Sequence, residues 1–270
     1  MGRAPSLLIV KQVSKHFGAR HTLDQALDNV SFEMNKGNIV GLLGKNGAGK
    51  TTLMRILTSF ITASSGTVTI DGDDINKHSL SIRQKIGYLP EKPPLYGDMT
   101  VQYYLTFAAE IKGVSKNKRK FQLAKVLEEC DLGQVKQKTI ATLSKGYKQR
   151  VGIAQAIIHE PKLLILDEPT SGLDPMQIQQ VLTLIKNQQD QRTVLLSTHT
   201  LTEIEQVAQR VLMIKSGRIV VDDRLDNLLK NKDPTKLKPQ SLTLEQVFIN
   251  HHQPQTQQES GTSNDILGVR

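Results

Sequence analysis

The chain has 270 residues, with 35 Lys and Arg against 26 Asp and Glu, a formal net charge of +9 and one cysteine. A single cysteine excludes an internal disulfide framework, and no stretch approaches the ~20 uninterrupted apolar residues that a membrane-spanning helix needs. We therefore expect a soluble chain from a reducing compartment, whose basic charge fits nucleic acid, an anionic membrane surface or a nucleotide substrate.

The first 75 residues favour strands. Four runs rich in β-branched and aliphatic residues are separated by Gly, Asn, Lys and Asp, namely LLIVKQV, LDNVSFEM, NIVGLLG and GTVTIDG. They predict an N-terminal β region, interrupted by one long helix that starts near Gly49.

The segment between Tyr96 and about Glu160 has helical periodicity. Hydrophobic residues recur there at spacings of three or four, as in Val101, Leu105 and Ala108, and again in Leu123, Val126 and Leu127. This pattern predicts a helical subdomain at about residues 92–160. We expect Cys130 to be a small buried residue on one of its helices.

Strands and helices alternate from Leu163 onward. LLILDEP and TVLLSTH are typical of buried strands, and each precedes a helix with one hydrophobic face, made of Ile178, Val181, Leu182 and Ile185 or of Ile204, Val207 and Ala208. Such alternation predicts a mostly parallel sheet with covering helices. After VLMIKSGRIVVDD we expect short helical pieces over residues 226–250, the last near TLEQVFI, and a disordered polar tail over residues 251–270.

An apolar strand leads into GLLGKNGAGKTT, which has the Gly-x-x-x-x-Gly-Lys-Thr pattern of a P-loop. The glycines permit close backbone approach, and N–H groups at the start of the next helix favour phosphate. We predict that Lys50 reaches the β and γ phosphates of a nucleotide and that the Thr51 hydroxyl ligates Mg²⁺. The binding residues predicted from this motif are Gly44, Lys45, Asn46, Gly47, Ala48, Gly49, Lys50, Thr51 and Thr52.

The run LLILDEP brings two carboxylates to the exposed end of a buried strand, where open α/β sheets bind ligands. We predict that Asp167 holds Mg²⁺ through water. Because side chains alternate along a strand, we expect Glu168 to point to the other side, where it orients or deprotonates an attacking water. A surface Asp-Glu pair without such a role is the alternative.

Four further motifs resemble those of the ATP-binding subunit of ABC transporters, over about residues 7–225. LSKGYKQR resembles the signature sequence, SGLD with Asp174 resembles the D-loop, His199 in LLSTHT resembles the switch histidine, and Phe17 in KHFG occupies the place of an adenine-stacking aromatic. The resemblance implies an α/β fold: a P-loop NTPase core with a mostly parallel sheet, an N-terminal antiparallel β subdomain and an inserted helical subdomain, together spanning residues 1–225. A polar surface His199 and a merely packed Phe17 remain the alternatives.

The same resemblance implies a composite site, because subunits of this family close head to tail around ATP. The Ser144 hydroxyl and the Gly146 N–H, at the start of a helix running from about Lys145 to Ile158, would then contact the γ-phosphate bound by a partner subunit. An ordinary helix cap is the simpler role of Ser144, and the two are compatible.

Two residues depart from the commonest family signature: Lys145 replaces a second Gly, and Tyr147 replaces a Gln. The Lys form resembles exporters of the drug, sodium and gliding-motility subgroup, and SLTLEQVFI resembles the ending of that subgroup. The resemblance favours an exporter over an importer.

Glu91 in YLPEKPPLY follows a strand that we expect to be buried. The family usually carries Gln at this position, where it touches Mg²⁺ and the attacking water and moves with the surface that receives the permease. Glu91 keeps an oxygen ligand for Mg²⁺ but loses the amide donors. The alternative is that Glu91 points to solvent and that Pro93 and Pro94 only stiffen a linker.

The resemblance implies a Mg²⁺-dependent ATPase that works as a homodimer or heterodimer and drives an integral membrane permease from the cytoplasmic face of the membrane. Glu168 and His199, with Glu91, are the expected catalytic residues, and ATP and Mg²⁺ the cofactors. The main alternative is a soluble ABC ATPase acting on ribosomes or DNA, against which stand one Gly-Lys-Thr loop and the lack of sustained heptads. We expect no nucleic acid partner. An inactive regulatory subunit is a third possibility, which the complete set of catalytic positions disfavours.

Overall fold

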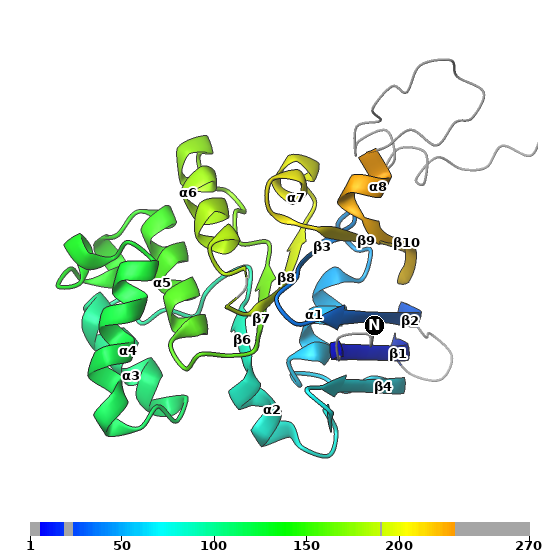
Figure 1. Cartoon of the computed structure of the whole chain (residues 1–270), viewed down its shortest axis with the longest axis horizontal. Coiled ribbons are helices and arrows are strands. Elements are labelled where there is room, and N and C mark those ends of the chain that lie inside the picture. Colours follow the sequence, from blue (N-terminus) through cyan, green and yellow to red (C-terminus); the bar gives the residue numbers. More distant parts are fainter. Residues whose placement is uncertain (1–5, 19–23, 190, 230–270) are drawn as a thin grey trace, which may run out of the picture.

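The computed structural model describes residues 6–18, 24–189 and 191–229. Two β-sheets stand on one side of the molecule and a group of helices on the other (Figure 1). Within the described part of the chain, no helix is both long enough and apolar enough to cross a membrane.

The first sheet is antiparallel where its pairings are defined and has the strand order β2-β1-β4-β5. Its strands are β1 (Ser6–Phe17), β2 (Asp24–Asn35), β4 (Ser65–Ile70) and the short β5 (Asp73–Asp74). Along β2, buried residues such as Leu27 and Phe32 alternate over much of the strand with exposed ones, as expected for a sheet with one face on the core.

The second sheet has the order β10-β9-β3-β8-β7-β6. In chain order its strands are β3 (Ile39–Leu43), β6 (Ile86–Leu89), β7 (Leu163–Asp167), β8 (Thr193–Thr198), β9 (Arg210–Lys215) and β10 (Arg218–Arg224). Only β10 runs antiparallel to its neighbour. Strands β3, β7 and β8 are buried throughout, because helices or the other sheet cover both faces.

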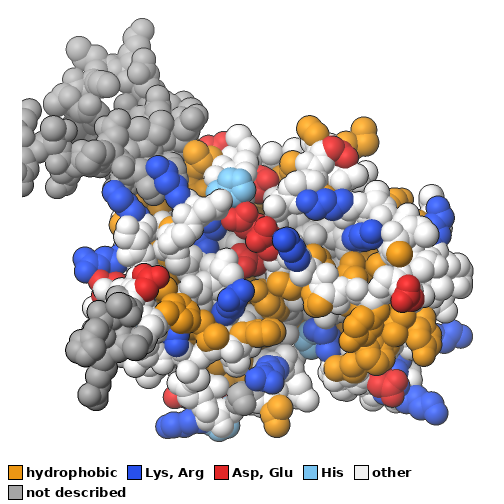
Figure 2. Space-filling model, turned by 180° about the vertical axis from the view of Figure 1, so that it is seen from behind, with side chains coloured by type: hydrophobic (Ala, Val, Ile, Leu, Met, Phe, Trp, Pro, Cys, Tyr) orange, Lys and Arg blue, Asp and Glu red, His pale blue; other side chains and the backbone are white. Residues whose placement is uncertain are grey.

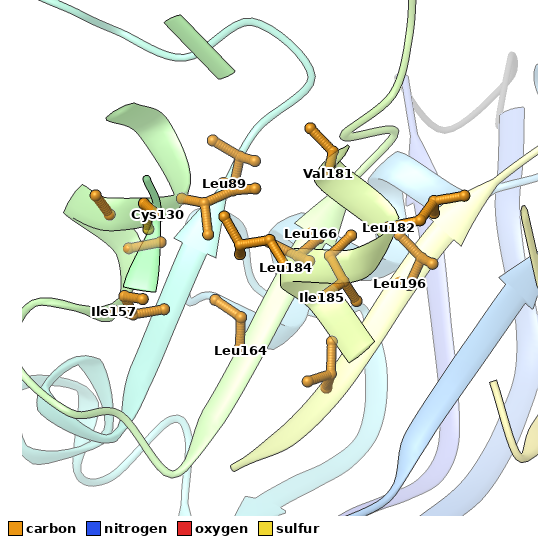
Figure 3. Close-up of a cluster of buried hydrophobic side chains, with 14 of the residues drawn as sticks. Leu89, Cys130, Ile157, Leu164, Leu166, Val181, Leu182, Leu184, Ile185 and Leu196 are labelled. Carbon is orange, nitrogen blue, oxygen red and sulfur yellow. The ribbon is translucent and has the colours of Figure 1, made fainter. Parts of the chain in front are cut away.

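The two faces of this parallel sheet belong to two separate cores. On one face, alternate residues such as Leu163 and Ile165 pack with α1 (Lys50–Leu57) and the antiparallel sheet. On the other face, Leu164 and Leu166 pack with the helical layer, as Figure 3 shows with residues of α5 (Lys145–Ile157) and α6 (Pro175–Lys186) around them. The sheet is therefore fixed from both sides, and so are the loops at its strand ends.

The helical layer contains α3 (Val101–Ile111), α4 (Lys116–Glu129), two short 3₁₀ turns and α5. The side chains of Thr100 and Ser144 cap α3 and α5 by accepting from the backbone N–H three residues on. Cys130 caps the end of α4 and is fully buried, and burial raises the pKa of its thiol far above the ordinary range. The expectation of a small buried cysteine is therefore confirmed.

The remaining helices are α2 (Ser79–Lys85), α7 (Leu201–Val207) and α8 (Leu225–Leu229). The predicted fold class is confirmed: an α/β core with a mostly parallel sheet, an antiparallel N-terminal sheet and added helices. The helix expected near TLEQVFI and the tail expected over residues 251–270 lie outside the described residues.

One prediction about local structure is wrong. The helix after Gly49 is not long, since α1 has 8 residues. It ends because Thr58 turns its hydroxyl back onto the Met54 carbonyl and because Ser59 has a φ of 58°, a left-handed conformation that a right-handed helix excludes.

Candidate functional site

Many of the predicted site residues come from the carboxyl ends of four neighbouring parallel strands. In spatial order these are β3 with the P-loop, β8 with His199, β7 with Asp167 and Glu168, and β6 with Glu91 two residues beyond its end. A cavity of about 460 Å³ lies there, lined by Phe17, Asp24, Gln25, Ala26, Asn46, Gly47, Gly49, Lys50, Thr51, Thr52, Glu91 and Glu168. In Figure 2, acidic side chains gather near the middle of the visible face, with Lys and Arg side chains around them.

The backbone conformation of the P-loop requires glycine at two positions. Gly47 has a φ of 80° and Gly49 a φ of 109°, both in the region that favours glycine. A Cβ on Gly49 would also come within 2.7 Å of the Ala26 carbonyl oxygen. Gly49 precedes α1 without a side-chain cap, and the first turn of α1 has no acidic residue. The N–H groups at this helix start are therefore suited to an anion.

Lys50 is 5% exposed and folds back over the loop. Its Nζ donates to the carbonyl oxygens of Gly44 at 2.7 Å and Lys45 at 3.3 Å, and it lies 3.3 Å from Glu168 Oε1. A nearly buried ammonium held by two carbonyls and one carboxylate is a fixed positive charge on the inner wall of the cavity. Such a charge fits the phosphate chain of a nucleotide.

Asp167 ends β7 and is 2% exposed. Burial raises the pKa of its carboxyl above the ordinary value, and the Ser197 hydroxyl, which donates to it at 2.6 Å, lowers it in part. The nearby charge of Glu168 raises this pKa further, whereas hydrogen bonding from the Thr51 hydroxyl and the charge of Lys50 lower it.

The oxygens of Asp167 and Thr51 are thus adjacent, as a magnesium site needs. No cluster of three or more His, Cys, Asp or Glu suited to a metal occurs in the described part of the chain. Mg²⁺ is commonly held by one or two protein ligands together with substrate phosphates and water.

The expectation that Glu168 points away from the Asp167 side is wrong. Glu168 lies beyond the end of β7 with a φ of 46°, so strand alternation no longer applies to it. Its N–H donates to the carbonyl oxygen of Ser197 at 3.1 Å and to its Oγ at 3.2 Å. Both carboxylates consequently reach the P-loop, and Glu168 lines the cavity.

His199 follows β8 and is about half exposed. Its Nδ1 lies 3.0 Å from Glu168 Oε2, within hydrogen-bonding distance. The structure therefore brings His199 and Glu168 together from adjacent strands, although His199 does not itself line the cavity.

Phe17 and Glu91 both belong to the cavity lining. Phe17 at the end of β1 is 43% exposed, and Lys15 Nζ lies 5.0 Å from the centroid of its ring. The exposed face of such a ring can stack on a base. Glu91 is also exposed and lines the same cavity.

Three predicted residues are not brought to this cavity. Ser144 accepts from the Tyr147 N–H at 3.4 Å, Gly146 packs against the Gln177 side chain, and Asp174 accepts from the Gln177 N–H at 2.9 Å. Together they lie at the starts of α5 and α6. Ser144 does cap its helix, which confirms the simpler of its two expected roles.

The departures from the family signature also have defined contacts. The Tyr147 ring, which replaces a Gln, lies 4.2 Å from the guanidinium carbon of Arg150. Arg150 in turn pairs with Asp131 at 2.7 Å and so ties the middle of α5 to the turn that follows α4. Tyr147 therefore makes a cation–π contact within the signature segment.

The sequence analysis missed a set of buried hydroxyls and one carboxylate. Ser197 connects Asp167 with Glu168, while Thr170 and Thr198 both contact Glu203 on α7. A sequence signal was present in STHT, where two hydroxyl residues immediately precede the histidine at a buried strand end.

The family model described as ABC transporter matches residues 27–171. The chain is 40% identical over 222 residues to the uncharacterized ABC transporter ATP-binding protein YxlF of Bacillus subtilis (strain 168), across 82% of this chain and 72% of that protein. It is 36% identical over 227 residues to the bacitracin transport ATP-binding protein BcrA of Bacillus licheniformis, across 83% and 72%. Among solved structures, the dimeric post-hydrolysis state of the ATP-binding cassette MJ0796 bound to ADP and Pi matches with a TM-score of 0.73 at 25% identity, across 81% of this chain and 98% of that one.

Proposed function

This chain belongs to the ABC transporter family as an ATP-binding subunit, and from that premise we propose that it hydrolyses ATP in a head-to-tail dimer to drive a separate membrane permease, as an exporter. The ATPase class and the use of ATP with Mg²⁺ follow from membership. The observation that carries the proposal is the meeting of Lys50, Glu168 and His199 at one cavity edge.

We assign ATP binding to the P-loop, residues 44–52. Lys50 and the N–H groups at the start of α1 hold the phosphates, and Phe17 stacks on the base. Thr51 and Asp167 would hold Mg²⁺, with Glu91 as a further oxygen ligand, and the ion supplies charge neutralisation at the phosphates when bound. The adjacency of the Thr51 and Asp167 oxygens supports this assignment.

We assign the water-activating role to Glu168. Its Oε1 faces the Lys50 ammonium, and its Oε2 faces His199 Nδ1. Once phosphate draws Lys50 away, Glu168 is left as a carboxylate at the cavity wall, suited to orient water and accept its proton. His199 keeps that carboxylate in place and contacts the γ-phosphate.

The dimer explains why Ser144, Gly146 and Asp174 lie away from the cavity of their own chain. We propose that the starts of α5 and α6 face the ATP of a partner subunit, with Ser144 and Gly146 toward the γ-phosphate. Support comes from the N–H groups at the start of α5, where the Ser144 side chain caps only that of Tyr147, and from the dimeric state of the matched cassette MJ0796.

A second groove adjoins the segment that contains Glu91. This groove supports the proposal of a permease partner. It has a volume of about 840 Å³, and Pro90 and Lys92, on either side of Glu91, both line it. The rings of Phe60 and Tyr88 pack together in it with centroids 6.0 Å apart, and Phe60 is 72% exposed. One segment therefore borders both the ATP cavity and an apolar groove.

The charges of this groove indicate what it receives. Its basic residues are Arg55, Arg83, Lys92 and Lys112, and no described residue in its lining is acidic. Burial lowers the pKa of Lys112 to about 8. Ser59 Oγ and Gln155 Oε1, which also line the groove, are buried without a hydrogen-bond partner. We propose that a permease segment with apolar side chains and a carboxylate docks here, which holds the chain at the inner face of the membrane.

The export direction rests on the Lys145 form of the signature sequence and on the relative named for bacitracin transport. To test the whole proposal, the full chain is expressed in its own cells, which are then separated into washed membranes, ribosomes and nucleic acid. The amount of the chain in each fraction is measured. We expect it with the membranes, bound to one integral protein that stimulates its ATPase activity. Recovery with ribosomes or DNA instead would overturn the proposal in favour of a soluble ATPase.

A further inference from the structure

Glu203 on α7 is a buried carboxylate, 5% exposed. Its Oε2 accepts hydrogen bonds from the Thr170 hydroxyl at 2.8 Å and the Thr198 hydroxyl at 2.7 Å. Within the described residues, no Lys, Arg or His forms an ion pair with it. A buried carboxylate without a cationic partner is costly, so two hydroxyl donors are its main compensation.

The two hydroxyls belong to the two loops that carry Glu168 and His199. Thr170 follows Glu168 in the loop between β7 and α6, and Thr198 directly precedes His199 at the end of β8. Thr170 is 5% and Thr198 2% exposed. A single oxygen of Glu203 is therefore hydrogen-bonded to both the segment that carries Glu168 and the segment that carries His199.

The backbone of these two loops needs contacts from outside the loops to keep its conformation. Glu168 has a φ of 46°, which a non-glycine residue adopts only when surrounding contacts hold it. The Thr198 hydroxyl also accepts from the Thr200 N–H at 3.0 Å, so it fixes the backbone on both sides of His199. The contact between His199 and Glu168 depends on both loops at once.

We propose that Glu203 is a positioning residue for ATP hydrolysis, which holds Glu168 and His199 in their mutual contact. The inference rests on the proposed roles of those two residues. Because Glu203 touches neither the P-loop nor the cavity, it acts on the hydrolysis step rather than on ATP binding.

The test compares kcat and KM for Mg-ATP in the purified full chain. Glu203→Met keeps the side-chain length and removes the acceptor, so we expect kcat to fall about ten- to hundredfold with KM changed less than about twofold. Glu203→Gln retains an acceptor oxygen for both hydroxyls, and we expect it to restore kcat to within about threefold of wild type. The matched control is Gln188→Met at a buried polar residue at the end of α6, where we expect wild-type kcat.

Wild-type kcat in Glu203→Met would overturn the proposal, as would a kcat loss shared by Gln188→Met. If Glu203→Met does not fold, Thr170→Val and Thr198→Val each remove one of the two hydrogen bonds to Glu203. Wild-type kcat in both of these variants would overturn the proposal. Glu168→Gln is measured in parallel. Undiminished hydrolysis in that variant would refute the role of Glu168 itself, independently of the Glu203 result.

Discussion

His199 Nδ1 lies 3.0 Å from Glu168 Oε2, although the two residues are separated by a helix and a strand in the chain. Strands β7 and β8 are parallel neighbours, with Asp167 opposite Ser197. Their carboxyl ends therefore bring the acidic residue and the histidine to one edge. The other Glu168 oxygen faces Lys50, so one carboxylate links the histidine with the P-loop.

Replacing the carboxylate tests its proposed role as the water-activating group. We expect Glu168→Gln to bind ATP as wild type does, to lose hydrolysis by a factor of about 10² to 10⁴, and to accumulate a nucleotide-bound dimer. Single-turnover assays and analytical ultracentrifugation with Mg-ATP measure both effects. Glu128→Gln on the exposed face of α4 is the control and should behave as wild type. Hydrolysis at the wild-type rate in Glu168→Gln would remove that residue from the role.

Removing the imidazole should mainly affect the chemical step. We expect His199→Ala to lower kcat about ten- to hundredfold and to change the ATP dissociation constant far less, because the P-loop and the start of α1, which hold the phosphates, stay intact. His78, at the start of α2, is exposed, and His78→Ala serves as the control. A large loss of ATP affinity with unchanged kcat in His199→Ala would contradict this assignment.

Changing the charge at Glu91 should separate ATP binding from coupling. Glu91→Gln removes a negative charge from the cavity wall, so we expect ATP binding that is unchanged or up to about tenfold tighter. Glu91→Ala should weaken the coupling of hydrolysis to the permease, seen as a smaller stimulation of the ATPase by the permease. Titration calorimetry and ATPase assays with and without the reconstituted permease measure the two effects.

Asp98→Ala provides the control for this pair, since Asp98 is exposed in the same loop and does not line the cavity. Full permease stimulation in Glu91→Ala would mean that the segment only links the strand to the helices.

Lys112 should make stability depend on alkaline pH. Burial lowers its pKa to about 8, whereas an unfolded lysine titrates near ~10.4. Between these values the unfolded chain binds more protons, so the contribution of Lys112 to stability rises with pH in this window and is constant below pH ~8. We expect Lys112→Met to be more stable than wild type at pH 7, by about 1 to 3 kcal/mol, and to lack that rise.

Urea unfolding at pH 7 and pH 10 measures this difference, with Lys92→Met as the exposed control in the same groove. An equal pH response in wild type and Lys112→Met would show that Lys112 is not desolvated. When a permease segment carrying a carboxylate is bound, we expect the stability difference between Lys112→Met and wild type at neutral pH to change sign. The charged lysine then has a partner, which the variant lacks.

The sequence determined the elements whose signals are local. The P-loop glycines, the buried runs of β3, β7 and β8, and the cap at Ser144 depend on nearest neighbours in the chain, so pattern and residue type predict them. The order of motifs also sufficed for the family, which the comparisons confirm.

Only the tertiary structure decided how these elements contact one another. Glu168 does not follow the side-chain alternation of β7, because Ser197 of the adjacent strand holds its backbone. The bridge through Glu203 and the partial burial of Lys112 were not visible in the sequence either. Each depends on packing between segments far apart in the chain, and such packing overrides local preference wherever it fixes a backbone angle or removes a charge from water.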